Sequence, residues 1–361
     1  MKKNTKLKLF LFFSLLCQIC FAQVDVVYST LVWSDEFNTN GAIDSNKWFH
    51  QTQLPAGGNW FNGEVQHYTN RVTNSFVDSD FLNIVSKKEV FTDQGNTKQF
   101  TSARLNSKFA FKYGRVDVRA KIPIEAGTWP AIWMLGKNIN EDGGYFDAAF
   151  GTVGWPACGE IDIMEHGIFP SQSVNYIQSA LHTPSSFGNT VNIGGIVASD
   201  VANNYHTYSL NWSPNRISFL LDDVIYYTYN PTVKNANNWP FDLEQYILLN
   251  IAMGGIAGSI ATNFTQSSML IDYVRVYQNP LSSDENKLSA LNISPNPTND
   301  FINISTSSFI DKVEIYNLLG NLVLSSISNT NKIDISNLTK GIYLINIYSG
   351  IEKSVKKIIV D

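Results

Sequence analysis

The feature that most constrains the fold is a succession of short alternating segments between residues 24 and 279, separated by turn residues. Residues 205–229 show it best, because three runs of alternating apolar and polar positions are broken at 213–215 and 222–223. Residues 108–121 alternate in the same way. A period of two is typical of half-buried strands, and no window of helical length carries a 3.6-residue apolar stripe. We therefore predict an all-β domain, a large sandwich of two antiparallel sheets.

The N-terminus has the pattern of a signal peptide. Four lysines lie among the first eight residues, an apolar run follows at residues 9–16, and small residues precede Gln23. This order predicts export, with residues 1–22 removed as the signal peptide. Acylation at Cys20 is a weaker alternative, because bulky Ile19 stands where that signal prefers a small residue.

Composition and cysteine content exclude several classes. The net charge of −5 gives no basic surface for nucleic acid, and we expect a monomer. After removal of the signal peptide only Cys158 remains of three cysteines, so no intramolecular disulfide can form. Cys158 has no nucleophile pattern around it and is predicted to be a packed strand residue.

A second unit follows a polar linker at residues 280–287. Residues 288–361 contain no tryptophan and hold several short alternating segments. The sequences SPNPT at 294–298, VEIYNLLG at 313–320, KGIYLI at 340–345 and KKIIV at 356–360 resemble the C-terminal sorting domain of type IX secretion substrates. The resemblance implies a small β-sandwich read by the type IX secretion machinery. A small immunoglobulin-like module that binds glycan is the alternative.

Three carboxylates crowd into one predicted strand. Glu160 and Asp162 share a face by alternation, whereas Glu165 is out of phase with them. A β-bulge would reset the phase and bring Glu165 onto the same face, and bulges often re-aim side chains beside active sites. Crowded like charges cost free energy, so we expect this arrangement to have a chemical purpose.

Paired carboxyl groups are what a glycosidase needs. A retaining enzyme uses a carboxylate nucleophile and a protonated carboxyl group about 5–5.5 Å away, whereas an inverting pair is about 6.5–9.5 Å apart. Asp162, between the two glutamates, could share a proton with a neighbour. Taken alone, the three acids fit equally well an exposed acidic strand or a calcium site.

Motifs around the acids resemble glycoside hydrolase family 16, in particular its laminarinase-like members. They are WPACGEIDIMEHG at 155–167, VWSDEF at 32–37, NGEVQHYT at 62–69, YGRVDVRA at 113–120, GTWPAIWML at 127–135 and IDYVRVY at 271–277. The resemblance covers most of residues 31–278 within a catalytic domain at 23–279. It implies a β-jelly roll with a cleft across its concave sheet. It also implies that Glu160 is the nucleophile, Glu165 the general acid and base, and Asp162 the assisting carboxylate.

The resemblance also implies binding residues. Substrate contacts are expected from the following side chains: Trp129, Trp133, Trp155, Arg104, His182, Asn62 and Trp60. The alternatives are packing for Trp129, Trp133, Asn62 and Trp60, a solvated strand position for Arg104, and a hydrogen-bonded strand histidine for His182. The long segment 138–152 carries Tyr145, Phe146 and Phe150, which we expect to wall one end of the cleft and exclude branched glucans. Asp272, with backbone near Glu36, matches a family calcium position, although an ordinary strand-edge role is nearly as compatible.

Together these patterns predict a secreted or surface-attached, retaining endo-β-1,3-glucanase that hydrolyses laminarin and needs no cofactor for catalysis beyond a possible structural calcium. Three alternatives remain open. One is hydrolysis of another β-glycan, such as mixed-linkage glucan or an agar-type galactan, although the acidic balance argues mildly against anionic chains. Another is a lectin-like binding protein, which would not require the three acids. A structural adhesin would leave the cleft tryptophans unexplained.

Overall fold

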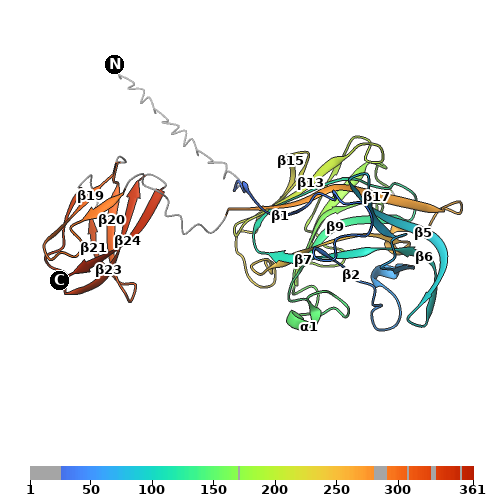
Figure 1. Cartoon of the computed structure of the whole chain (residues 1–361). Coiled ribbons are helices and arrows are strands. Elements are labelled where there is room, and N and C mark those ends of the chain that lie inside the picture. The colour runs from blue at the N-terminus through green and yellow to red at the C-terminus, as the bar shows by residue number, and fades with distance from the viewer. Residues whose placement is uncertain (1–25, 170, 280–290, 307–308, 327–330, 350–351) are drawn as a thin grey trace, which may run out of the picture. The chain divides into compact units, whose positions relative to one another are not determined.

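The computed structural model describes residues 26–169, 171–279, 291–306, 309–326, 331–349 and 352–361. The expected signal peptide at 1–22 and linker at 280–287 lie outside these residues. The chain divides into two compact units, Met1–Gln278 and Asn279–Asp361 (Figure 1), which we describe separately. In the described part of the chain, no helix is both long enough and apolar enough to cross a membrane.

The first unit is a sandwich of two sheets that lie one over the other (Figure 1). Among the described residues one sheet has ten strands, with the order β15-β14-β13-β8-β17-β5-β6-β3, and with β1 paired to β17 and β4 to β5. Their bounds are β1 Thr30–Asp35, β3 Gln66–Tyr68, β4 Ser75–Asp78, β5 Phe81–Asp93, β6 Asn96–Ser102, β8 Gly114–Lys121, β13 His206–Trp212, β14 Ile217–Leu221, β15 Val224–Tyr229 and β17 Gln266–Gln278.

The other sheet positions the candidate site. It has seven strands within the described ranges, with the order β12-β11-β10-β9-β16-β7-β2. Their bounds are β2 Trp48–His50, β7 Arg104–Phe111, β9 Thr128–Gly136, β10 Glu160–Glu165, β11 Tyr176–His182, β12 Ile193–Val197 and β16 Gln245–Met253. Only three short helical turns accompany the strands of this unit in the described chain, namely η1 Phe61–Gly63, α1 Asp147–Phe150 and η2 Gly255–Ala257.

The core fills the space between the two sheets, because inward-facing side chains alternate along nearly every strand. Fully buried members include Trp48, Trp212, Phe219, Ile247 and Leu249. Burial of apolar surface contributes roughly 25 cal/mol per Å², so a core of this size stabilises the unit without a disulfide. Cys158, the one cysteine among the described residues, is buried and unpaired.

The all-β prediction is confirmed, and the meander at residues 205–229 is present as the antiparallel strands β13, β14 and β15. Residues 108–121 differ from a simple alternating pair. Their first part belongs to β7 in the seven-stranded sheet, and their second part is β8 in the ten-stranded sheet. The chain changes sheets at Tyr113, which has a φ of 58°, before Gly114 with a φ of 146°. Local alternation does not reveal which sheet a strand joins.

The second unit is a smaller two-sheet structure. Its described strands form a three-stranded sheet, β18-β19-β22, and a four-stranded sheet, β21-β20-β23-β24. The bounds are β18 Asn292–Ser294, β19 Phe301–Ser305, β20 Lys312–Asn317, β21 Leu322–Ser326, β22 Lys332–Asp334, β23 Gly341–Ser349 and β24 Glu352–Val360. Isoleucines dominate its separate core, including Ile302, Ile315, Ile345 and Ile358.

Candidate active site

Strand β10 carries the three acids, and its register contains the predicted bulge. Asp162 lies opposite Ala180 and Glu165 opposite Gln178 in β11, so the two residues 163 and 164 face one residue, Ser179. Ile163 and Met164 both belong to the core. The Ser179 hydroxyl donates to the Ile163 carbonyl at 2.7 Å, which satisfies a backbone group that the irregular ladder exposes. The bulge therefore places Glu165 on the face that Glu160 and Asp162 occupy.

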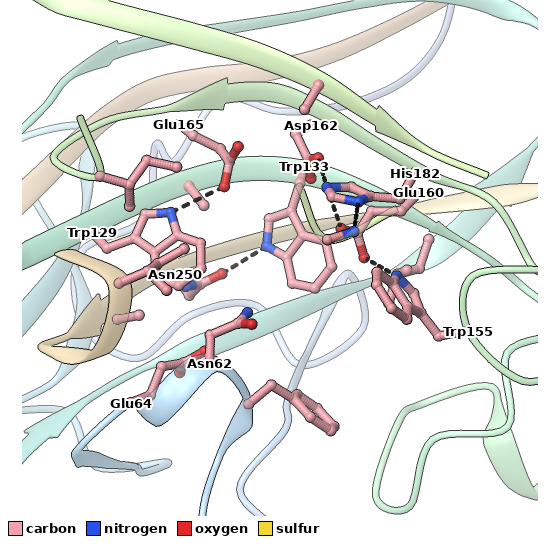
Figure 2. Close-up of a pocket in the computed structure, with 18 of the residues that line it drawn as sticks. Asn62, Glu64, Trp129, Trp133, Trp155, Glu160, Asp162, Glu165, His182 and Asn250 are labelled. Atoms are coloured by element: carbon pink, nitrogen blue, oxygen red, sulfur yellow. Dashed lines mark hydrogen bonds and ion pairs between the residues drawn. The ribbon is translucent and has the colours of Figure 1, made fainter. Parts of the chain in front are cut away.

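Each outer glutamate receives a hydrogen bond from a tryptophan. Trp155 Nε1 donates to Glu160 Oε2 at 3.0 Å, and Trp129 Nε1 donates to Glu165 Oε1 at 3.1 Å. Figure 2 shows the three acids in a row along the strand, with these indoles on the side of the pocket. The hydrogen bonds therefore fix the nitrogen edges of the Trp155 and Trp129 rings against Glu160 and Glu165, the two glutamates expected to react with a substrate.

His182 in β11 lies beside Glu160 and Asp162. Its Nε2 lies 3.6 Å from Glu160 Oε1 and 3.4 Å from Asp162 Oδ2. Ligand-type atoms of these three residues lie within 4.8 Å of one another. The distance from His182 Nε2 to Asp162 Oδ2 is too long for a good hydrogen bond, and Asp162 Oδ2 has no hydrogen-bond partner among the described residues.

Burial dominates the electrostatics of the acids. Desolvation, and then the neighbouring Asp162, raise the pKa of Glu160 well above its ordinary value. Desolvation raises the pKa of Asp162 to about 8. Desolvation followed by the charge of Asp162 raises the pKa of Glu165 to about 8, although bonds from Trp129 and Gln178 act in the opposite direction. Near neutral pH the row therefore holds protons that isolated carboxyl groups would have lost.

The acids lie in a cleft of about 1090 Å³ on the outer face of the seven-stranded sheet. Six of the seven predicted binding residues line it, namely Trp129, Trp133, Trp155, Arg104, His182 and Asn62. The volume is at the upper end of the range for ligand pockets, which suits several sugar rings rather than one. Indole rings offer sugars flat apolar faces with a polar edge.

The seventh residue, Trp60, is placed elsewhere. It is 3% exposed and packs with Leu54 and Tyr68, and it lines a separate hollow behind η1 rather than the cleft. Its ring supports the cleft from behind, because the Arg104 guanidinium carbon lies 5.4 Å from the ring centroid. The neighbouring residues Phe61 and Asn62 border the cleft instead.

The segment 138–152 borders the cleft with different residues from those expected. Tyr145, Phe146 and Phe150 are not among the cleft-lining residues, and Phe146 is buried against Tyr246. The lining comes from residues 139–142. Phe146 anchors this loop to the sheet through Tyr246 of β16, and three of the four lining residues of the loop are polar.

The acidic side chains at the predicted calcium position have cationic partners. Asp272 forms an ion pair with Arg119, and Glu36 forms a two-pronged pair with Arg275. The Arg275 hydrogen bond lowers the pKa of Glu36. A calcium shell needs carboxylate oxygens that are free to coordinate, so Arg119 competes for the carboxylate that Asp272 was expected to offer. The other expected ligands, backbone oxygens near Glu36, do not involve the Glu36 carboxylate.

Several lining residues were missed in the sequence. Glu64, Glu141 and Asn250 all face the cleft. A signal existed for two of them. Asn250 interrupts a strand that is otherwise buried and almost entirely apolar, and Glu64 begins an alternating polar series with Gln66 and Tyr68. Glu141 lies in an irregular loop, where no pattern indicates the direction of a side chain.

A two-sheet sandwich with carboxyl groups on one bulged strand in an aromatic-lined cleft defines the class of a glycoside hydrolase. The comparisons agree: the profile of glycosyl hydrolases family 16 matches residues 64–275. A secretion system C-terminal sorting domain matches residues 292–361. The chain belongs to glycoside hydrolase family 16, and its sorting domain indicates secretion.

Three curated relatives and one crystal structure illustrate the range. A Niallia circulans glucan endo-1,3-beta-glucosidase A1 is 35% identical over 69% of this chain and 38% of its own length. A Rhodothermus marinus beta-glucanase is 34% identical over 69% and 85%. A Sphingobacterium multivorum keratan-sulfate endo-1,4-beta-galactosidase is 35% identical over 70% and 56%. A Zobellia galactanivorans LamA variant in complex with laminaritriose and laminaritetraose is 45% identical over 70% and 100%, with a TM-score of 0.64. The chain thus spans from about two fifths to most of the length of these curated relatives.

Proposed function

We propose that the protein is an exported endo-β-1,3-glucanase that hydrolyses laminarin-type polymers by double displacement, with retention at the anomeric carbon. The observation that carries this proposal is the bulge in β10, which puts Glu160, Asp162 and Glu165 on one face inside the cleft. Similarity to glucan-acting relatives and to a laminarioligosaccharide complex supports glucan as the substrate class. Export through the type IX machinery, with the chain as a monomer, completes the proposal.

The first chemical step needs a proton donor. Glu165, whose pKa is raised to about 8, retains its proton at neutral pH and donates it to the glycosidic oxygen as the bond to the anomeric carbon breaks. A Glu160 oxygen attacks that carbon and forms a glycosyl-enzyme ester. The released glucan fragment carries the proton away as a new hydroxyl group.

The second step reverses the roles. Ionised Glu165 removes a proton from water, the water oxygen attacks the anomeric carbon, and the ester bond to Glu160 breaks. The sugar leaves with its original configuration, and both glutamates return to their starting states. No metal ion or organic cofactor is required for these steps.

Glu160 must be ionised in order to attack, although burial raises its pKa. Its carboxylate accepts the indole hydrogen bond of Trp155 and lies near His182, and both interactions favour the charged form. His182 lies near both acids, and the Trp155 hydrogen bond distinguishes them, because Asp162 Oδ2 receives no hydrogen bond from the described residues. One proton shared by this close pair therefore resides on Asp162 and leaves the charge on Glu160.

The test is product release from laminarin, mixed-linkage glucan and agarose by the full chain, with Glu160→Gln as the control. We expect reducing ends from laminarin, none in the variant, and β-configured ends when NMR spectra are recorded early. Initial α-ends would exclude retention. Release from agarose instead of laminarin would make the enzyme a galactan hydrolase, and tight binding of laminarin without release would make it a lectin-like protein.

A further inference from the structure

A chain of hydrogen bonds runs from Trp133 in β9, which is the neighbour of β10, through Asn250 in β16 and Tyr68 in β3 to Glu64. Trp133 Nε1 donates to Asn250 Oδ1 at 2.7 Å, Asn250 Nδ2 donates to Tyr68 Oη at 3.2 Å, and Tyr68 Oη donates to Glu64 Oε2 at 3.0 Å. Figure 2 shows the first of these bonds, with Glu64 on the side of the pocket away from the catalytic acids. All four residues line the cleft.

The chemistry of its ends fixes the direction of this chain. An indole N–H can only donate, so Asn250 must turn its carbonyl oxygen toward Trp133. Its NH₂ group then faces Tyr68, whose hydroxyl can accept only if its own proton points to another acceptor. The Glu64 carboxylate is that acceptor. If it is lost, Asn250 can flip and place NH₂ against the indole N–H, which removes the bond to Trp133.

A second arm ends on the same carboxylate oxygen. The backbone N–H of Met253 donates to Gln66 Oε1 at 2.8 Å, and Gln66 Nε2 donates to Glu64 Oε2 at 2.7 Å. A backbone N–H is also only a donor, so this arm has one direction as well. Two donor chains from β16 and β9 therefore converge on one buried carboxyl group, and Glu64 is 8% exposed.

The local sequence explains how one short extended segment supplies three of these groups. Glu64, Gln66 and Tyr68 are separated by two positions each, so their side chains point to the same side of the extended segment that ends in β3. The Tyr68 ring is almost fully buried and packs edge-on against Trp60, with ring centroids 4.8 Å apart. Its hydroxyl can thus be removed while the ring remains held.

Trp133 is the part of this network that matters for a substrate. It lies opposite Asp162 in the β9–β10 register, and the Arg104 guanidinium carbon is 4.9 Å from its ring centroid. The guanidinium restrains the ring face, and the hydrogen bond to Asn250 restrains rotation in the ring plane. Both restraints are needed if the exposed part of the ring is to stack against a sugar at a fixed angle.

We propose that Glu64 is a positioning residue, which holds the Trp133 sugar platform through Tyr68 and Asn250 without itself reacting. The inference rests on the proposed function, because it assumes that Trp133 contacts a glycan. Its rival is direct contact of Glu64 or Tyr68 with the substrate, since both also line the cleft. The two hypotheses differ in one respect. If Glu64 is a positioning residue, its effect on substrate binding depends on Trp133, whereas a direct contact with the substrate does not.

The first experiment needs no substrate. In the full chain with ¹⁵N-labelled tryptophan, hydrogen exchange of the Trp133 indole N–H is measured by NMR, and Trp133→Phe identifies its signal. Tyr68→Phe should accelerate this exchange about threefold to tenfold, the value of one hydrogen bond. Tyr208→Phe is the matched control, because that hydroxyl is also buried but has no partner among the described residues. Unchanged exchange in Tyr68→Phe, or equal acceleration in the control, would overturn the proposal.

A pair of variants at position 64 protects the test against misfolding. Glu64→Gln keeps an oxygen that can accept from Tyr68, so exchange of the Trp133 indole should change less than about twofold. Glu64→Leu removes the acceptor and should reproduce the effect of Tyr68→Phe. Equal acceleration of indole exchange by Glu64→Gln and Glu64→Leu would show that the acceptor oxygen at position 64 does not set the direction of the hydrogen bonds.

The second experiment is a double-mutant cycle with laminarin as the substrate. Tyr68→Phe should raise KM about threefold to tenfold with little change in kcat. In a Trp133→Phe background, Tyr68→Phe should raise KM no further, because the indole N–H that the hydrogen bonds hold in place is already absent. Equal increases in both backgrounds would indicate direct contact and refute positioning. Failure of the wild-type chain to hydrolyse any glycan would refute the proposed function instead, and the exchange result would still stand.

Discussion

The two walls of the cleft hold buried acids of the same kind in opposite situations. On the catalytic wall, formed by β10, three carboxyl groups crowd together and one Asp162 oxygen lacks a hydrogen-bond partner in the described chain. On the far wall, Glu64 accepts from Gln66 and Tyr68, and Glu141 accepts from Arg104 at 2.8 Å and Gln51 at 3.0 Å. Partnered acids build the site, whereas crowded acids with few donors are left in the protonation states that chemistry requires.

The largest expected difference between the walls is in catalysis. Glu165→Gln should lower kcat/KM on laminarin by about 10²–10⁴-fold, because the leaving oxygen loses its proton donor. Glu141→Gln should change kcat by less than about threefold, since glutamine still accepts from Arg104. An aryl β-glucoside oligomer with a good leaving group serves as the control, because its bond breaks with little protonation. A loss of equal size on both substrates would contradict the acid role of Glu165.

Stability should respond in opposite directions at the two walls. The folded pKa of Glu165, about 8, exceeds the ordinary value of 4.5, so this group stabilises the fold below pH 4.5 and loses that contribution as pH rises through 8. Glu165→Gln should therefore increase the free energy of unfolding at pH 8 relative to pH 5, by about 1–3 kcal/mol. Urea titrations at both pH values measure it. A gain that does not depend on pH would show that the native carboxyl titrates normally.

Glu141→Leu should have the reverse effect and destabilise the protein at both pH values. The variant leaves the 3% exposed Arg104 without its carboxylate, which costs about 3–5 kcal/mol. Arg104→Met in the same background should recover part of the loss, because the uncompensated charge is then removed. If the double variant is no more stable than the single one, the ion pair is not what holds this wall.

The smallest expected effect is a shift of the pH profile. The alkaline limb of kcat/KM should fall near pH 8, where Glu165 loses its proton. The Trp129 hydrogen bond lowers the pKa of Glu165, so Trp129→Phe should move this limb upward by about 0.5 unit. Trp155→Phe is the comparison, because its indole donates to Glu160 instead. A downward shift in Trp129→Phe would contradict this account.

The sequence by itself determined the all-β class, the second unit at the C-terminus and the bulged acidic strand. Alternation is a local property, and a single β-bulge is enough to bring a carboxylate that is one residue out of phase onto the same face. The register of β10 and β11 contains this bulge between Asp162 and Glu165. Trp129, Trp133 and Trp155 line the cleft as expected. Trp155 stands in the same sequence motif as the acids, whereas Trp129 and Trp133 were expected from the family resemblance of the separate motif at 127–135.

Only the tertiary structure decided which side chains meet from distant strands. It separated the two parts of residues 108–121 into different sheets and turned Trp60 away from the cleft. It paired Glu36 and Asp272 with arginines. It also linked Trp133 of β9, Asn250 of β16 and Tyr68 of β3 to Glu64 by hydrogen bonds across three strands. The physical reason is that hydrogen bonds and burial depend on neighbours brought together by sheet order, whereas a local pattern records only which way a side chain points along its own strand.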